Sequence, residues 1–370
     1  MSEYREGGID YQHARYDIDT LRGYVLGKGE NLAAALAMHA KVILKSDVEY
    51  ELIEPLRIGQ PCMVVGHGAK IKVSTPASPV VAVEMQLQSP AIEGLKGVTF
   101  SGVRFESSVT AGNILFSALC PMTFVSCDFY GFNGCCLNLH AGGMVKGCVF
   151  VTCHRCIRAS GPRRVSVGQC LFDRCLVGIS ATHDVALLGN TAVCTYCFCL
   201  VGGGGVVKYN TVLNPHRWVE DSHFELMTCM GEKPMPLYAV HFPGSLQHPW
   251  PDFSDNVFMK CKIYVGNRRG AWNPARCAFN YSQLCLGRGV LPKFVPFGCF
   301  HQTALLTSLS GFESESTEVV KCECGLSHTR QTPHVQNVTA RFRLREQPVD
   351  PVDVCVEEVS KGRGGGDRWG

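Results

Sequence analysis

The sequence repeats itself at intervals of about twenty residues, and this period constrains the fold more than any other feature. The repeated element is Cys-x-Phe or Asn-x-apolar. It recurs at Cys127/Phe129, Cys148/Phe150, Cys170/Phe172, Asn190/Ala192, Asn210/Val212 and Asn256/Phe258. Self-similarity at a fixed spacing of this size is typical of solenoids, in which each repeat forms one coil and packs on its neighbours.

The segments between these anchors predict strands and turns. Short β-rich pieces such as Val165–Val167 and Val206–Tyr209 precede the anchors, and Gly, Asn or Pro separates them. No interval carries the ten or more residues of apolar 3.6 periodicity that a crossover helix needs. Parallel strands without helices predict an all-β fold, namely a single-stranded right-handed parallel β-helix with coils of about 20–24 residues.

Stacked coils place each anchor directly above its counterpart, because neighbouring strands lie roughly 4.8 Å apart. The 21 cysteines are then mostly small core residues, and stacked asparagines can bond along the axis. The coil spacing would permit disulfides, but the reducing interior of a cell opposes them. The predicted ladder residues are Cys127, Cys148, Cys170, Asn190, Asn210, Asn256, Phe129, Phe150 and Phe172.

The same pattern divides the chain into parts. Open ends of a β-helix expose core and unpaired strand edges, so a cap is expected. We predict a tail over 1–30, a capping helix over 31–45, a β-helix over 46–290 with an irregular excursion at about 213–252, a C-terminal extension over 291–345 and a flexible tail over 346–370.

Composition limits the partners. The first residues are charged rather than apolar, and no apolar run reaches the ~18 residues of a membrane span, so we expect an intracellular protein that does not use the membrane. A net charge of +3 is too small to indicate nucleic-acid binding by itself, so an anionic partner requires a local cluster.

Two groups of basic residues are candidates for partner binding, with a solvated face as the alternative. The first group is Arg155, Arg158, Arg163, Arg164 and Arg174, and the second is Asn267, Arg268 and Arg269 between two glycines. Arginine pairs bidentately with carboxylates and phosphates. RNA binding stays uncertain, because Phe129–Phe132 is only superficially similar to an RNA-recognition motif and Phe129 is expected in the core.

The sequence gives less support to a catalytic function than to a binding function. β-Helix enzymes that act on carbohydrates cluster their carboxylates for calcium binding or acid/base catalysis. Here Asp128, Asp173, Asp184 and Asp255 are scattered singly, and no phosphate loop, His-Glu-x-x-His pair or nucleophile elbow occurs. We therefore predict a binding protein without intrinsic catalytic residues; the alternative is a degenerate carbohydrate-active β-helix enzyme.

One motif outside the ladder indicates a metal. Cys322, Cys324 and His328 offer three of the four tetrahedral ligands of zinc. The fourth ligand stays open among Cys299, His301, His334 and Cys355, and the alternative is a turn with two ordinary thiols. Zinc is the one cofactor that the sequence predicts.

Several phrases together resemble one family. They occur in order over roughly residues 31–335 and are Asp128–Asn133, Gly147–Phe150, Cys170–Cys175, Val265–Gly270 and Cys322–Gly325. In these phrases the chain is similar to the adenovirus early region 1B large T antigen.

The resemblance implies a viral early protein and oncogene product of the host nucleus and cytoplasm. Such a protein binds and inactivates the host's tumour-suppressor transcription factor and represses transcription. With a viral early region 4 protein it joins a ubiquitin ligase of cullin, elongins and a RING subunit, and there recruits antiviral and DNA-repair proteins as substrates. The resemblance also implies late viral mRNA export, support of viral replication and non-covalent SUMO ligase activity toward the tumour suppressor.

Overall fold

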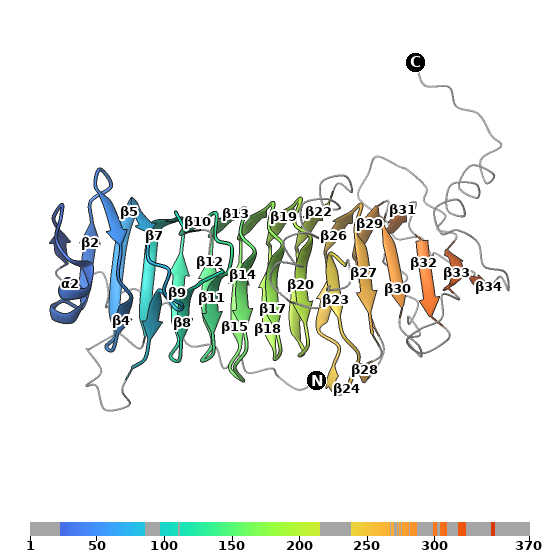
Figure 1. Cartoon of the computed structure of the whole chain (residues 1–370). Coiled ribbons are helices and arrows are strands. Elements are labelled where there is room, and N and C mark those ends of the chain that lie inside the picture. The colour runs from blue at the N-terminus through green and yellow to red at the C-terminus, as the bar shows by residue number, and fades with distance from the viewer. Residues whose placement is uncertain are drawn as a thin grey trace, which may run out of the picture.

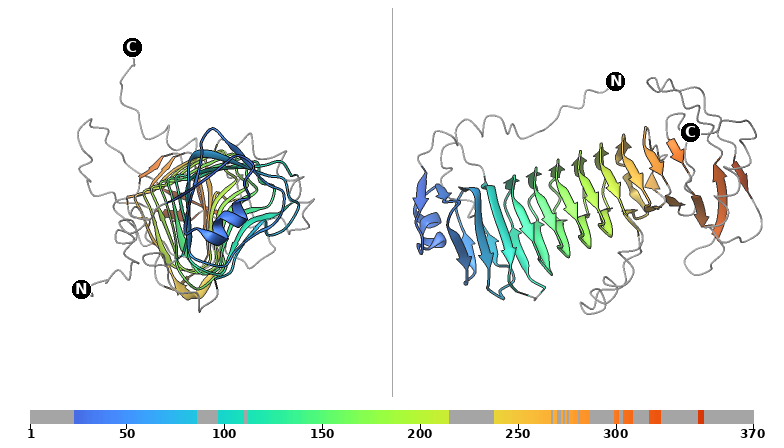
Figure 2. Two further views of the ribbon diagram at one scale, coloured as in Figure 1. Left: turned by 90° about the vertical axis from the view of Figure 1, so that its left-hand side faces the viewer. Right: turned by 90° about the horizontal axis from the view of Figure 1, so that it is seen from above.

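The chain winds into an elongated stack of parallel strands (Figure 1). The computed structural model describes residues 23–85, 97–109, 112–214 and 238–266. Towards the C-terminus it describes residues 268–269, 272, 274, 276–280, 282–286, 299–301, 304–308, 317–322 and 342–344. Viewed along the axis, the coils superimpose around one closed core (Figure 2). The predicted parallel β-helix is confirmed.

Each coil has three walls, defined by the register between strands. The first wall contains β1 (Tyr24–Leu26), β2 (Lys41–Leu44), β9 (Met122–Val125), β12 (Gly143–Lys146), β15 (Val165–Gly168), β18 (Val185–Leu188), β21 (Gly205–Lys208) and β25 (Asp252–Ser254). The second wall contains β3 (Glu49–Leu52), β10 (Asp128–Tyr130), β13 (Val149–Val151), β16 (Leu171–Asp173), β19 (Thr191–Val193), β22 (Thr211–Leu213), β26 (Val257–Met259), β29 (Ala278–Asn280) and β31 (Cys299–His301). β5 (Cys62–Val73) and β7 (Val98–Ser107) run through both walls.

The third wall is a separate sheet. It contains β4 (Leu56–Ile58), β6 (Val81–Val83), β8 (Ile114–Ala118), β11 (Cys135–Leu139), β14 (Arg155–Ala159), β17 (Val177–Ala181), β20 (Cys197–Val201), β23 (Val240–Phe242), β27 (Lys262–Val265), β30 (Gln283–Leu286) and β32 (Ala304–Ser308). We call the bends after the first, second and third walls the first, second and third corners.

A left-handed residue makes the first corner in coil after coil. It immediately precedes each Cys or Asn of the predicted ladder, at Ser126, Gly147, Gln169, Gly189, Tyr209 and Asp255. Thr152, Arg174, Cys194 and Lys260 make the second corner in the same way. A non-glycine residue in this conformation costs roughly 1–2 kcal/mol. The stack offsets that cost, because the corner amides still bond the next coil, as Gln169 N does to the carbonyl of Leu188 at 3.0 Å.

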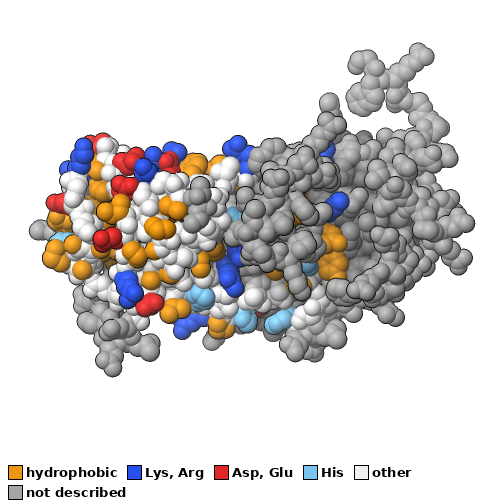
Figure 3. Space-filling model, in the orientation of Figure 1, with side chains coloured by type: hydrophobic (Ala, Val, Ile, Leu, Met, Phe, Trp, Pro, Cys, Tyr) orange, Lys and Arg blue, Asp and Glu red, His pale blue; other side chains and the backbone are white. Residues whose placement is uncertain are grey.

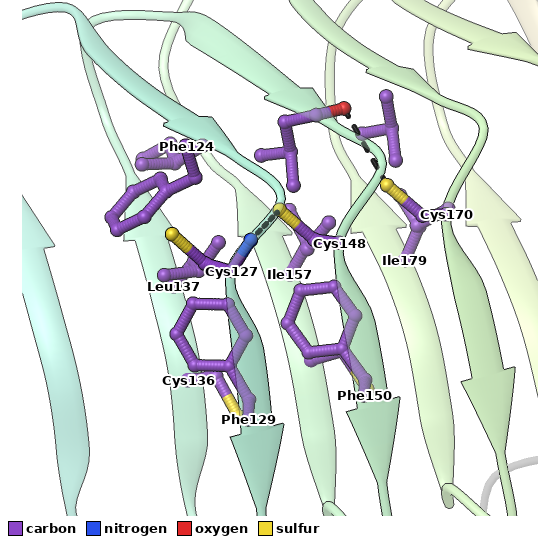
Figure 4. Packing of buried hydrophobic residues seen from close by; sticks show 14 of the residues in the cluster. Phe124, Cys127, Phe129, Cys136, Leu137, Cys148, Phe150, Ile157, Cys170 and Ile179 are labelled. Carbon is purple, nitrogen blue, oxygen red and sulfur yellow. Dashed lines mark hydrogen bonds between the residues drawn. The ribbon is translucent and has the colours of Figure 1, made fainter. Parts of the chain in front are cut away.

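The side chain after each first corner points into the core and bonds along the axis. Asn190 Nδ2 donates to Asn210 Oδ1 at 2.9 Å, and Asn210 Nδ2 donates to Asn256 Oδ1 at 2.9 Å. All three amides are at most 1% exposed. The cysteine half of the ladder follows the same geometry, since Cys127 N donates to Cys148 Sγ at 3.4 Å (Figure 4). Polar ladder groups are therefore satisfied in the core, as burial requires.

Aromatic rings form a second line two residues later. Phe129 pairs in register with Phe150, and Phe150 with Phe172. The rings of Phe129 and Phe150 stack at a centroid distance of 4.7 Å (Figure 4). Those of Phe150 and Phe172 stack at 5.2 Å. The stack ends where Ala192 takes the next position, and there Phe198 of the third wall contacts Phe172 edge-on at 5.9 Å.

The N-terminal cap is shorter than the sequence predicts. The expected helix over 31–45 is wrong in extent: α2 spans Leu32–Met38, capped by Asn31, whose side chain accepts from Ala33 N and Ala34 N. It ends because Lys41–Leu44 contains the β-branched residues Val42 and Ile43, alternates in burial as a strand does, and pairs with β5. Leu32, Ala35 and Leu36 cover the core at this end, as the axial view shows (Figure 2).

Other segment boundaries in the structure also differ from those predicted from the sequence. The tail predicted over 1–30 is wrong at its end, because β1 already pairs with β2 in the stack. The coils continue past residue 290 through β31 and β32, after which β33 (Thr317–Cys322) and β34 (Phe342–Leu344) pair antiparallel. The excursion expected to last to residue 252 is shorter, since β23 rejoins the third wall at Val240. Among the described residues, no helix has the length and hydropathy for a membrane crossing.

Replacing Phe150 by Ala should lower the free energy of unfolding by about 3–5 kcal/mol, because a cavity opens between two stacked rings in a rigid coil. Leu188→Ala, at a position 39% exposed, is the control and should change it little. Urea denaturation followed by circular dichroism measures both. A wild-type midpoint for Phe150→Ala would contradict this packing.

Substitutions of Asn210 should separate the contribution of side-chain size to the free energy of unfolding from the contribution of the ladder hydrogen bonds. Asn210→Ala leaves a buried donor of Asn190 without an acceptor and should lower the free energy of unfolding by at least about 2 kcal/mol. Asn210→Cys, which introduces the residue of other coils, should lower it less.

At neutral pH, Asn210→Asp should lower the free energy of unfolding more than either of these substitutions. Burial raises the pKa of such a carboxyl in the folded state, so stability falls as pH rises above its unfolded pKa of about 4. Unfolding curves at pH 4 and pH 7 test this, and a pH-independent deficit for Asn210→Asp would refute it.

Candidate partner-binding surface

The outer face of the third wall carries the first basic group. Register places Asn138, Arg158 and Ser180 side by side on β11, β14 and β17. Arg158 is exposed, whereas Arg155 at the start of β14 is half-buried. Burial raises the pKa of the neighbouring Cys135 thiol to about 11, and the charges of Arg155 and Arg158 oppose that rise. A positive field therefore covers this part of the wall.

A chain of hydrogen bonds ends this face at the third corner. Asn138 is 5% exposed, and its Nδ2 lies 2.9 Å from His140 Nε2. On the other side of the ring, His140 Nδ1 lies 2.8 Å from Ser160 Oγ. When the amide donates to Nε2, the ring donates from Nδ1 to Ser160, and the serine hydroxyl keeps its own proton for an outside acceptor.

Arg163 and Arg164 occupy the third corner, separated from Ser160 by two residues, and both are exposed. Their backbone packs on the glycines of the previous coil: a Cβ on Gly142 would lie 2.9 Å from Arg163 Cβ and 2.9 Å from the carbonyl oxygen of Arg164. The next coil places Thr182, His183 and Asp184 at the same corner. Lys, Arg and His side chains follow the lower edge of the molecule there (Figure 3).

Arg174 does not belong with this group. It makes the second corner, on the far side of the third wall, and its guanidinium pairs with Asp173 at 2.9 Å. The five arginines that the sequence groups together are therefore divided, because two residues of one coil at different corners lie a whole wall apart.

The second basic group lies on the third corner as well. β28 (Arg268–Arg269) pairs with β24 (Ser245–Pro249) in a two-stranded sheet that extends this corner. The corner continues from Arg163 through Gly203, which packs on His183, and Gly204, whose Cβ would lie 3.5 Å from Pro249. Four coils separate the two groups, roughly 19 Å along the axis. Asn267 lies outside the described residues.

The four aspartates that could have formed a catalytic cluster stand apart. Asp128 and Asp173 lie two coils apart on the second wall, and Asp184 accepts from Gly204 N at 2.8 Å at the third corner. Asp255 makes a first corner, where the Arg276 guanidinium holds its pKa below the usual range. In the part of the chain that is described, these carboxylates are not paired as glycosidases require.

The cysteines whose side chains are described lie almost entirely in the core. Of the fifteen cysteines whose burial is described, all but Cys194 are buried. Burial raises the pKa of Cys62, Cys197 and Cys261 to about 12, so they are protonated at neutral pH and are poor nucleophiles and metal ligands. No group of metal-binding side chains occurs among the described residues. Cys322 ends β33, while Cys324 and His328 lie outside the described residues.

Sequence reasoning missed the polar chain of Asn138, His140 and Ser160 and the ring cluster of Tyr238, His241 and Tyr264. The rings contact at 5.0–5.7 Å on the third wall. A register table built from the repeat could have aligned His140 with Ser160. The RNA-recognition similarity has no support here, because Phe129 and Phe132 are at most 4% exposed.

The whole chain is similar to proteins of one viral family. The sequence profile described as "Adenovirus EB1 55K protein / large t-antigen" matches residues 2–357. The E1B 55 kDa protein of Human adenovirus A serotype 12 is 28% identical over 93% of this chain and 70% of its own length. That of Murine adenovirus A serotype 1 is 29% identical over 91% and 80%, and that of Tree shrew adenovirus serotype 1 is 28% identical over 88% and 84%.

Proposed function

Because the chain belongs to the adenovirus E1B 55 kDa protein family, a family of early proteins, we propose that it binds and inactivates the host's tumour-suppressor transcription factor. In this proposal it also acts as substrate receptor of a ubiquitin ligase. The third corner provides the contact surface, and its arginines receive the acidic activation segment of the tumour suppressor.

The basic third corner is the observation that carries the proposal. Activation segments are acidic and amphipathic, and they order against a basic and apolar partner. Exposed Arg163 and Arg164 and the strand Arg268–Arg269 share one edge, and the apolar and aromatic residues Leu200, His241 and Tyr264 lie in register on the adjoining wall. Such a rigid edge can hold an extended acidic chain without reorganising.

The remaining roles follow from family membership and are part of the same proposal. A viral early region 4 protein, cullin, elongins and a RING subunit complete the ligase, which marks DNA-repair and antiviral proteins. The protein works in the host nucleus and cytoplasm, supports late viral mRNA export and promotes SUMO attachment without a covalent intermediate. A stack of coils with separated carboxylates suits recruitment better than catalysis, because a long rigid surface can orient one protein towards another.

Reversing the charge of Arg268 and Arg269 to Glu should weaken binding of the tumour suppressor's activation segment at least tenfold, since like charges then face each other. We expect the melting temperature to stay nearly constant, because the backbone pairing of β28 with β24 does not involve the charged groups. Isothermal calorimetry at two salt concentrations measures the affinity, and wild-type binding should weaken as salt rises.

Arg57→Glu with Lys146→Glu is the matched control. These two cations are exposed on β4 and β12, away from the third corner, and their reversal makes the same change in net charge. If both double variants lose affinity equally, the binding reflects net charge alone and the proposed surface is wrong.

We also propose a zinc ion held by Cys322, Cys324 and His328. Two thiolates and an imidazole suit zinc, and binding would join the end of β33 to the chain that follows. Protein purified without chelator should contain about one zinc per chain by mass spectrometry, and Cys322→Ser with Cys324→Ser should contain none. Equal metal content in both proteins would contradict the site.

A further inference from the structure

Three described arginines, Arg158 near the end of β14 and Arg163 and Arg164 at the third corner, lack the ion pairs that Arg104 and Arg174 make. Within the described part of the chain, the guanidinium groups of Arg158, Arg163 and Arg164 are exposed and form no salt bridge. By contrast, Arg104 pairs with Glu106 at 2.7 Å and Arg174 pairs with Asp173 at 2.9 Å. The three cations lie on one short segment of chain, 158–164, so an anion bound between them would reduce their mutual repulsion.

The chain segment that carries these arginines also carries a hydroxyl group held from inside the protein. Arg158 and Ser160 are two residues apart on the outer side of β14 and its continuation, and Arg163 and Arg164 follow within the same bend. Ser160 Oγ is held 2.8 Å from His140 Nδ1. The ring is fixed in turn by Asn138, which is almost completely buried. The serine hydroxyl is thus oriented from inside the protein and can donate outward.

The number of donors matches a phosphate better than a carboxylate. A carboxylate has two oxygens and one charge, which a single bidentate arginine satisfies. A phosphate monoester has three free oxygens and a charge of about −1.5 to −2 at neutral pH. Three guanidinium groups and a hydroxyl offer enough donors for three phosphate oxygens. Among the residues described at this corner, Asp184 is the one carboxylate, and its Oδ1 already accepts from Gly204 N.

A polynucleotide fits these observations less well. Single-stranded nucleic acids bind to cationic grooves with exposed aromatic rings on which bases stack. The residues beside Ser160 on the neighbouring coils are His140 and Thr182, and the next glycine, Gly202, packs on Thr182. The tyrosines of the third wall begin only at Tyr238, further along the axis.

We propose that Arg158, Arg163, Arg164 and Ser160 bind a phosphate monoester carried on a phosphorylated side chain of a partner protein. His140 and Asn138 position the serine hydroxyl. The site shares Arg163 and Arg164 with the surface proposed above, and it adds a specific chemistry to that surface, recognition of a phosphate. Its test uses a phosphopeptide without acidic residues, so the two proposals can fail independently.

The experiment uses the full-length chain and fluorescence polarisation of a labelled glycine- and alanine-rich peptide with one central phosphoserine. The phosphopeptide should bind at least tenfold more tightly than the same peptide with serine or glutamate. Arg163→Ala with Arg164→Ala should reduce its affinity at least tenfold. Ser160→Ala should reduce it roughly threefold, as expected for one hydrogen bond.

Matched variants separate this site from folding and from the other surface. Arg163→Lys with Arg164→Lys keeps the charge but loses bidentate geometry, so it should bind with intermediate affinity. Arg174→Ala, and Arg268→Glu with Arg269→Glu, should bind the phosphopeptide like the wild type. Melting temperatures of all variants establish that each is folded.

Several outcomes would overturn the proposal. Equal affinity for the serine and phosphoserine peptides, or unchanged affinity after loss of Arg163 and Arg164, would exclude a phosphate site at this corner. If inorganic phosphate displaced the peptide at the same concentration as the unlabelled phosphopeptide, the site would recognise the free ion and not a modified protein. If octauridylate bound more tightly than the phosphopeptide, the corner would be a polynucleotide site.

Discussion

The structure depends on one bend repeated along the axis. A left-handed residue turns the chain between the first and second walls and aims the next side chain inward, where it meets its counterpart in the coil above. Asn190, Asn210 and Asn256 exploit this position with amide-to-amide bonds of 2.9 Å. Because each coil supplies the partners of the next, the strained backbone is stable only in the stack, as expected for a solenoid.

This repeated register also determines the surface. A one-residue slip of a strand would turn its core side chains outward and its outer side chains inward. The packing of the core therefore also fixes which side chains form the rows on the outer surface. His140 lies beside Ser160, and Arg163 packs over Gly142, because the third corner superimposes from coil to coil. Binding groups held this way need little reorganisation to meet a partner. That rigidity suits a protein whose family is one of viral regulators.

The period was readable from the sequence because the core of a β-helix tolerates few side chains at a corner. Cys and Asn are compact and can bond along the axis, so they recur, and Phe150 between Phe129 and Phe172 marks the same register. The boundaries were less readable. Residues 39–44 continue a helical pattern on paper, yet Lys41–Leu44 forms β2 because β5 offers it a strand partner. A competing tertiary contact cannot be seen in local sequence.

The sequence by itself therefore determined the fold class, the ladder and the family resemblance, since each rests on residues repeated or matched in order. Only the tertiary structure decided which arginines lie at the same corner. It separated Arg174 from Arg163 and Arg164 by placing them at different corners, and it brought β28 with Arg268–Arg269 to the same edge as Arg163. The physical reason is that the number of residues in each corner determines which side chains of neighbouring coils lie side by side. Backbone packing between the coils sets that number.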